Sequence, residues 1–161
     1  MIGELGQLVL CFALALSLVM AISGLMGARP TAFAARRTAT SSALGLLVFV
    51  VLAFGILTYA FVISDFSVML VANHSHTLKP LIYKISGVWG NHEGSMLLWV
   101  LVLALYAGLV AVLQRGGERL TSAALGVQGL LAAAFILFIL FTSNPFLRLD
   151  PAPFEGAGLM P

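Results

Sequence analysis

Residues 38–64, TATSSALGLLVFVVLAFGILTYAFVIS, form an uncharged and largely apolar run between Arg37 and Asp65. A helix rises about 1.5 Å per residue, so roughly 20 residues cross a hydrocarbon core about 30 Å thick. Backbone polar groups in lipid must be satisfied within the spanning segment, as they are in a helix, and the run lacks the period-2 alternation of a barrel strand. The run therefore predicts a transmembrane helix.

Three further runs have the same character: 5–28, 94–114 and 120–143. The chain has 161 residues, of which 61% are hydrophobic and 9% charged, against roughly 45–50% apolar and 25% charged residues in soluble domains. This composition excludes a soluble globular protein, and the small, scattered net charge of +2 excludes a nucleic-acid partner. We predict an all-α, polytopic membrane protein with four transmembrane helices in a single membrane domain, 1–161.

Polar residues inside the predicted spans are few. Gln128, which has a glycine on either side nearby, is the best candidate for an interhelical hydrogen bond. Small residues at every fourth position, such as Ala13, Ser17 and Ala21, indicate close helix packing. No ionisable side chain lies inside the four runs, which argues against an ion-coupled carrier or a proton relay built from these helices.

The basic residues divide unequally among the connections. Five of the eight Lys and Arg residues fall in the first and third loops, and three fall in the second loop and the C-terminal segment. The two sets are Arg29, Arg36, Arg37, Arg115 and Arg119 against Lys79, Lys84 and Arg148. By the positive-inside rule, the first and third loops are cytoplasmic and both termini lie outside the cytoplasm.

The second loop, 65–93, is the longest connection and holds all three histidines of the chain, His74, His76 and His92. Long loops of mixed composition are often functional. Within it, 66–72 is expected to form a short extended or amphipathic piece. Pro80 is expected to open a short helix over 81–88, because proline suits the first helical position. We expect this external loop to hold whatever function the chain has.

The densest polar cluster is GVWGNHEGS, 87–95, directly before the third apolar run. It predicts a shaped junction at the outer membrane interface, beside the positive end of a helix. The candidate binding residues are Trp89, Asn91, His92 and Glu93, with His74 upstream. The alternative is that His92 and Glu93 only cap the helix and hydrogen-bond the loop.

A metal site is a competing interpretation, because His74, His76, His92 and Glu93 are numerous enough to ligate one ion. Their spacing matches no standard zinc or copper pattern, so we predict no metal site. The sequence also lacks Gly-x-Ser-x-Gly and His-Glu-x-x-His, the usual signatures of hydrolytic sites, and it therefore indicates no catalytic residue.

Three stretches carry a resemblance to a known family. The run PLIYKISGVWGNHEGSMLLW, 80–99, closely resembles the amino-terminal region of the CcmF family of cytochrome c-type biogenesis proteins, the membrane component of the bacterial haem lyase. VANHS, 71–75, and TSNPF, 142–146, resemble the same family at matching places.

The resemblance implies a haem-handling, multi-pass protein of the bacterial inner membrane with both termini in the periplasm. The implied partners are a haem chaperone, a CcmH-type thiol protein and apocytochrome c, whose Cys-x-x-Cys-His sites receive the haem. The family's usual haem ligands lie beyond residue 161, so none is carried over to this chain. Should haem reach this segment, we expect His74, His76 or His92 as an axial ligand and Trp89 as a stacking partner.

The predicted function is that of the amino-terminal part of a haem lyase subunit, which handles haem on the outer face of the membrane. DPAPFEG, 150–156, resembles the start of the family's external loop. We therefore expect the external C-terminal segment, 144–161, to be truncated and the fragment alone to be inactive. The alternative is a structural membrane subunit that scaffolds the rest of an assembly and has no chemistry of its own.

Overall fold

The computed structural model describes residues 1–157, so the last four residues of the expected C-terminal segment, 144–161, lie outside the described part. Between residues 1 and 157 the secondary structure is helical. The helices are α1 (Ile2–Gly27), α2 (Phe33–Ile63), α3 (Met69–His74), α4 (Leu81–Gly87), α5 (His92–Leu113) and α6 (Glu118–Thr142).

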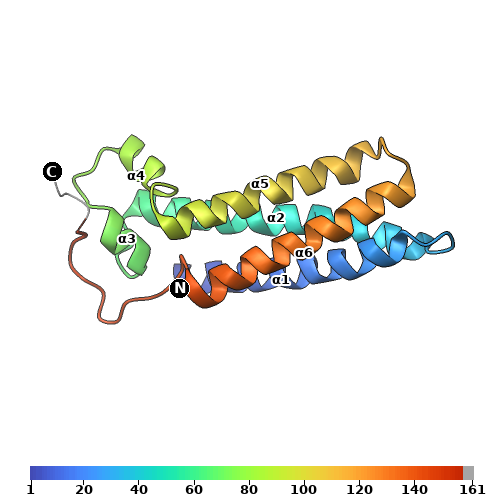
Figure 1. Cartoon of the computed structure of the whole chain (residues 1–161). Helices are drawn as coiled ribbons and strands as arrows, with labels where there is room; N and C mark the ends of the chain where they lie inside the picture. The colour runs from blue at the N-terminus through green and yellow to red at the C-terminus, as the bar shows by residue number, and fades with distance from the viewer. Residues whose placement is uncertain (158–161) are drawn as a thin grey trace.

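The four long helices form an antiparallel bundle, with α1 packed between α2 and α6, and α5 packed between the same two helices on the other side (Figure 1). Each of the four is long and apolar enough to cross a membrane. The expected all-α membrane protein with four spanning helices is thereby confirmed. The N-terminus, α3, α4 and the C-terminal segment lie together at one end of the bundle, and the two short helix connections lie at the other.

The helices extend beyond the apolar runs seen in the sequence, because charged residues continue the first or last turns. Glu4 lies in the first turn of α1, and α2 already begins at Phe33, which places Arg36 and Arg37 inside the helix. Glu118 likewise starts α6. A helical backbone continues through a charged turn at no great cost once its side chains reach the polar headgroup region.

Helices α1 and α6 approach so closely that their backbones touch at glycine positions. A Cβ atom added to Gly24 would lie 2.3 Å from the amide nitrogen of Gly126, and one added to Gly129 would lie 2.5 Å from that of Ala21. The hydrophobic effect does not drive helices together in lipid, because the lipid tails are as apolar as the side chains. Close van der Waals contact between small residues therefore stabilises such a pair. The buried Ala13, Ser17 and Ala21 confirm the predicted packing face.

One buried interhelical hydrogen bond joins α1 to α6, and it does not come from the residue that the sequence indicated. The Ser122 hydroxyl donates to the carbonyl oxygen of Gly24 at 3.0 Å. The Oε1 atom of Gln128, by contrast, is buried without a hydrogen-bond partner among the described residues. Sequence reasoning chose the larger amide, whereas the short Ser122 hydroxyl is the group that reaches the α1 backbone.

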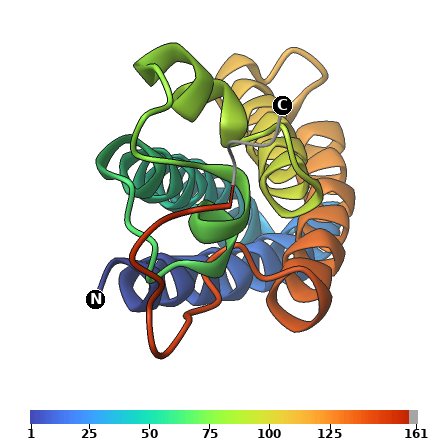
Figure 2. The same cartoon turned by 90° about the vertical axis from the view of Figure 1, so that its left-hand side faces the viewer.

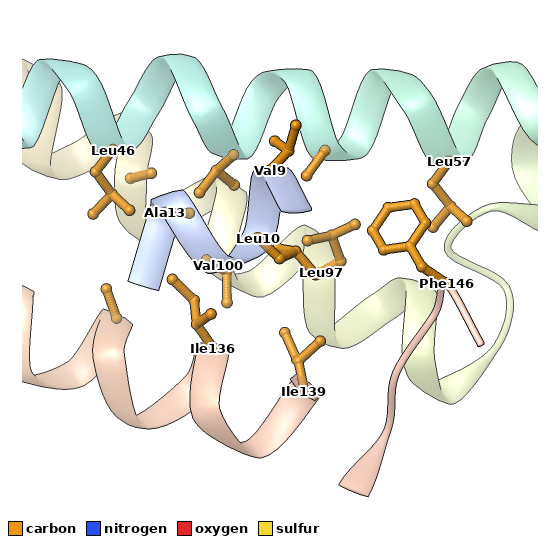
Figure 3. Packing of buried hydrophobic residues seen from close by; sticks show 14 of the residues in the cluster. Val9, Leu10, Ala13, Leu46, Leu57, Leu97, Val100, Ile136, Ile139 and Phe146 are labelled. Atoms are coloured by element: carbon orange, nitrogen blue, oxygen red, sulfur yellow. The ribbon is translucent and has the colours of Figure 1, made fainter. Parts of the chain in front are cut away.

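The apolar core runs along the bundle axis, and at the cap end it includes the buried ring of Phe146. Figure 3 shows Leu57 and Leu97 beside the ring of Phe146, which follows α6 and folds back into the bundle. Phe146 is only 2% exposed. A Cβ atom on Gly6 would lie 2.2 Å from the Phe146 ring, so α1 leaves a glycine-sized notch for this ring.

The segments 64–91 and 143–157 together form what we call the cap, which covers the end of the bundle (Figure 2). The expected long loop over 65–93 is not confirmed. It contains α3 and α4, and its last two residues belong to α5. The predicted short helix over 81–88 corresponds closely to α4, whereas the expected piece over 66–72 becomes helical at Met69. Burial of apolar side chains such as Phe66 and Val71 gives this segment a reason to fold.

The C-terminal part of the cap pairs with the part that precedes α3. The Met69 amide donates to the carbonyl oxygen of Leu147, and the Leu149 amide donates to that of Ser67, each at 2.8 Å. Arg148 and Glu4 form an ion pair at 2.7 Å. These contacts hold the segment after α6 against the other segment of the cap, 64–91, and against the start of α1.

Replacing Gly126 by alanine should lower the free energy of unfolding by about 1–3 kcal/mol, because the added methyl group forces the α1 and α6 backbones apart. The matched control is Gly55→Ala in α2, where an added Cβ meets nothing within 4 Å. That change should be neutral or stabilise the helix by up to about 1 kcal/mol. Both are measured by SDS titration in detergent micelles with circular dichroism. Equal effects of the two substitutions would contradict the close α1–α6 contact.

Candidate functional site

The predicted junction lies between α4 and α5 and is organised by Asn91. The Asn91 side chain accepts a hydrogen bond from the Gly94 amide at 2.7 Å and donates one to the carbonyl oxygen of Gly87, also at 2.7 Å. It therefore caps the start of α5 and ties it to the end of α4 at the same time. Asn91, one of the candidate binding residues, has its side chain occupied by this structural role.

Gly94 is required by the close packing of the same turn. A Cβ atom there would lie 1.6 Å from the carbonyl oxygen of Val88 and 3.0 Å from the Asn91 side-chain oxygen. The turn therefore admits no side chain at this position. The predicted departure from continuous helix is seen here as a tight turn that directs Trp89 and His92 outward.

Trp89 and His92 are exposed, and Glu93 is half-buried, at the surface of this junction. Trp89 is 43% exposed. The Nδ1 atom of His92 lies 3.4 Å from the Ser143 hydroxyl at the start of the C-terminal segment. Glu93 lies in the first turn of α5, where the helix dipole favours its negative charge.

The remaining histidines lie apart from His92, on and after α3. His74 ends α3, and its Nδ1 atom lies 3.1 Å from the carbonyl oxygen of Leu70. Its backbone approaches the junction, since a Cβ added to Gly87 would lie 3.9 Å from the His74 carbonyl oxygen. His76 instead faces Glu155, at 3.7 Å. Within residues 1–157, no three His, Cys, Asp or Glu residues are grouped closely enough to hold a metal ion.

Glu155 makes a polar latch between the two segments of the cap, which sequence reasoning missed. One of its carboxylate oxygens accepts a hydrogen bond from the Thr77 amide at 3.0 Å, and the other accepts one from the Thr77 hydroxyl at 2.7 Å. The Ala157 amide donates to the carbonyl oxygen of Ala72 at 2.7 Å. The two partners of the latch are far apart in the sequence and match no motif, so no local signal could have revealed it.

These hydrogen bonds from Thr77 to the carboxylate hold the pKa of Glu155 below its ordinary value of 4.5. His76 contributes a weaker effect in the same direction. A carboxyl group with a lowered pKa stabilises the folded state above its ordinary pKa, and that stabilisation is lost as the pH falls through the lowered value. The latch is therefore closed at neutral pH.

The opposite end of the bundle carries the other set of basic residues. Arg36 organises it. Its guanidinium group forms an ion pair with Glu118 of α6 at 2.9 Å and donates to the carbonyl oxygens of Gly27, Arg29 and Pro30. Arg36 thus closes the turn between α1 and α2 and fastens it to α6. The two sets of Lys and Arg residues counted in the sequence lie at opposite ends of the bundle.

The junction forms no enclosed haem site with the described residues. A haem site normally buries the macrocycle against apolar walls and offers an imidazole from within. Here His74 and His92 are surface residues on different helices.

Comparison with known proteins gives a consistent set of relatives. The chain is 51% identical, over its full length, to the cytochrome c-type biogenesis protein ccl1 of Rhodobacter capsulatus and 41% identical to CcmF of Escherichia coli K12. A solved structure titled "Cytochrome c Heme Lyase CcmF" superposes with a TM-score of 0.84, covers 91% of this chain and is 29% identical to it.

The chain spans about a quarter of each of these three proteins: 25% of ccl1, of the E. coli CcmF and of the solved chain. No family model matches the sequence. The relatives therefore bear on the bundle and the cap described above, and the remaining three-quarters of their length has no counterpart here.

Gly94→Ala should open the junction, because the methyl group cannot coexist with the Val88 carbonyl oxygen. We expect a loss of about 1–3 kcal/mol in the free energy of unfolding, as for other overpacked sites, together with a shift in Trp89 fluorescence in a Trp99→Phe background. The matched control is Gly90→Ala, where the nearest atom to an added Cβ lies 3.3 Å away. An unchanged Trp89 spectrum in Gly94→Ala would contradict the described turn.

Lowering the pH through the pKa of Glu155 in the folded protein, which lies below the ordinary value of 4.5, should release the latch. A nitroxide attached at the fully exposed Phe154 position, as Phe154→Cys in a Cys11→Ser background, should become more mobile by electron paramagnetic resonance as the pH falls from 7 to about 3. Adding Glu155→Gln should make the label mobile at every pH. A label that is equally immobile in both proteins at pH 7 would show that Glu155 does not hold the segment.

Proposed function

The chain belongs, by sequence and fold, with the amino-terminal portion of the CcmF-type cytochrome c biogenesis proteins, and we propose from this relationship that it takes part in cytochrome c maturation. The observation that carries the proposal is the match of the entire chain, cap and bundle together, to proteins of that name. The chain provides the helical membrane part, and the junction at Trp89–Glu93 handles haem on the surface of the cap.

The orientation that we propose places the cap in the periplasm of a bacterial inner membrane. The end of the bundle opposite the cap holds Arg29, Arg36, Arg37, Arg115 and Arg119. The cap holds the remaining basic residues, Lys79, Lys84 and Arg148. The positive-inside rule makes the first end cytoplasmic and leaves both termini outside. Haem attachment to cytochrome c on the outer face requires this orientation.

The exposed surface of the junction supports contact with a haem carrier. Trp89 offers an exposed indole that can stack on the edge of a macrocycle, and His92 and His74 offer imidazole nitrogens at the surface. Residues Leu81, Ile82 and Tyr83 of α4 are also exposed and extend this apolar surface. We propose a haem chaperone as the direct partner, with a CcmH-type thiol protein and apocytochrome c engaging the same assembly.

Trp89→Ala should lower the yield of covalent cytochrome c about fivefold, which corresponds to the loss of an aromatic contact of about 1 kcal/mol. The measurement is haem staining of cytochrome c in cells whose maturation depends on this protein, with its level checked by immunoblot. Trp99→Ala is the matched control, since Trp99 is 62% exposed on the membrane-spanning part of α5 and not on the cap. It should leave the yield unchanged.

A combined His92→Ala and Glu93→Ala variant separates this function from the structural alternative. If the chain only scaffolds the assembly, then this variant and Trp89→Ala should both mature cytochrome c normally at normal protein levels. The Asn91 cap, which does not use either side chain, keeps α5 in place in the double variant. A lower yield with an intact bundle would support haem handling at the junction.

A further inference from the structure

The basic end of the bundle holds a polar cavity of about 230 Å³ between α2, α5 and α6. Its lining includes Arg36, Arg37, Ser41, Glu118 and Ser122. This cavity lies at the opposite end from the junction and the cap, so the proposed haem handling makes no use of it.

The cationic groups of this cavity differ in what they already bind. Arg36 is paired with Glu118 and also donates to three backbone carbonyl oxygens, so four of its five N–H groups are used. Arg37 has no acidic partner among residues 1–157 and only lies over the Phe33 ring, at 5.9 Å from its centre. The Ser41 hydroxyl also has no hydrogen-bond partner among these residues. The cavity therefore presents one uncompensated positive charge and one hydroxyl donor to an incoming anion.

An apolar groove of about 410 Å³ adjoins the cavity between α5 and α6. Its walls are mostly apolar and include Tyr106, Leu109, Leu113 and Leu120, and Arg115 is also among its lining residues. Gln114 and Thr121 line both the cavity and the groove, so the two share a border. The groove runs from the bundle end towards the membrane-spanning part of α5, since Tyr106 lies two turns before the end of that helix.

We propose that the cavity and groove together bind one anionic phospholipid, with its phosphate at Arg37 and Ser41 and an acyl chain along Leu109 and Leu113. A polar, cationic cavity next to an apolar groove has the polarity of a phospholipid, and the two lie at one end of helices that are long and apolar enough to cross a membrane. Basic pockets between transmembrane helices bind acidic headgroups in this way. A soluble phosphate would fill the cavity and leave the groove without a ligand.

Titration of the 161-residue chain with phosphatidylglycerol in a neutral detergent, followed by native mass spectrometry, tests the headgroup contact. We expect one tightly bound lipid and about fivefold weaker binding to Arg37→Gln, as for the loss of one basic residue near an acidic headgroup. Arg119→Gln removes the same charge at the same end but does not line the cavity, and it should bind as the unchanged protein does. Equal weakening by both variants, or equal binding of phosphatidylcholine, would overturn the proposal.

The groove is tested by filling it. Leu113→Trp should weaken phosphatidylglycerol binding, whereas Leu105→Trp, at an exposed position of α5 outside the groove, should not. Circular dichroism checks that both variants keep their helices. Glycerol phosphate, which has the headgroup without acyl chains, should bind far more weakly than the lipid. Binding of glycerol phosphate as tight as that of the lipid would show a site for a soluble anion and overturn the assignment.

A photoreactive amino acid at Leu113, in cells, identifies what occupies the groove there. A crosslink to phospholipid that Arg37→Gln diminishes would support the proposal. A crosslink to a protein segment would show that protein covers the groove, and it would overturn the lipid assignment.

Discussion

The close contact between α1 and α6 is the constraint on which the other features depend. In lipid, two helices gain nothing from hiding apolar surface, so their association depends on how closely their backbones approach. Gly24, Gly126 and Gly129 permit that approach, and the Ser122 hydroxyl adds a hydrogen bond across it. Because α1 and α6 are the first and last of the long helices in residues 1–157, their contact brings the segment directly after α6 beside the start of α1. Phe146 reaches its notch at Gly6, and Arg148 reaches Glu4, only because of it.

The arrangement of the cap depends on this contact between α1 and α6. Once Phe146 is fixed in the bundle, the residues that follow are placed beside the segment before α3 and pair with it through backbone hydrogen bonds. The same path delivers Glu155 to Thr77. The junction between α4 and α5 is held separately, by Asn91 and the absence of a side chain at Gly94. Its exposed residues therefore stand on a rigid turn, which suits a surface that contacts another molecule.

The sequence predicts the parts of this structure that arise from local patterns. The apolar runs predict the four spans, the small residues predict their packing faces, and Pro80 predicts α4. It does not predict the contacts that join distant residues: Glu155 with Thr77, Arg36 with Glu118, or Ser122 with Gly24. Gln128 illustrates the limit, because a polar residue between glycines marks a close crossing without saying which side chain bonds across it. The expected long loop over 65–93 is not confirmed for a related reason, since the buried apolar side chains of this segment have partners in the C-terminal segment and the bundle, which no local pattern reveals.

The notch that Gly3 and Gly6 leave on α1 also bears on how the chain is made. These glycines enter the membrane first, but the ring that fills the notch belongs to residue 146. At a synthesis rate of about 5–20 residues per second, the gap between them lasts on the order of ten seconds. During translation α1 therefore lies in the bilayer without the Phe146 ring that packs against it in the folded chain. The bundle can form completely only after α6 has been inserted. The four helices of this bundle are thus synthesised before the cap can pack on their end.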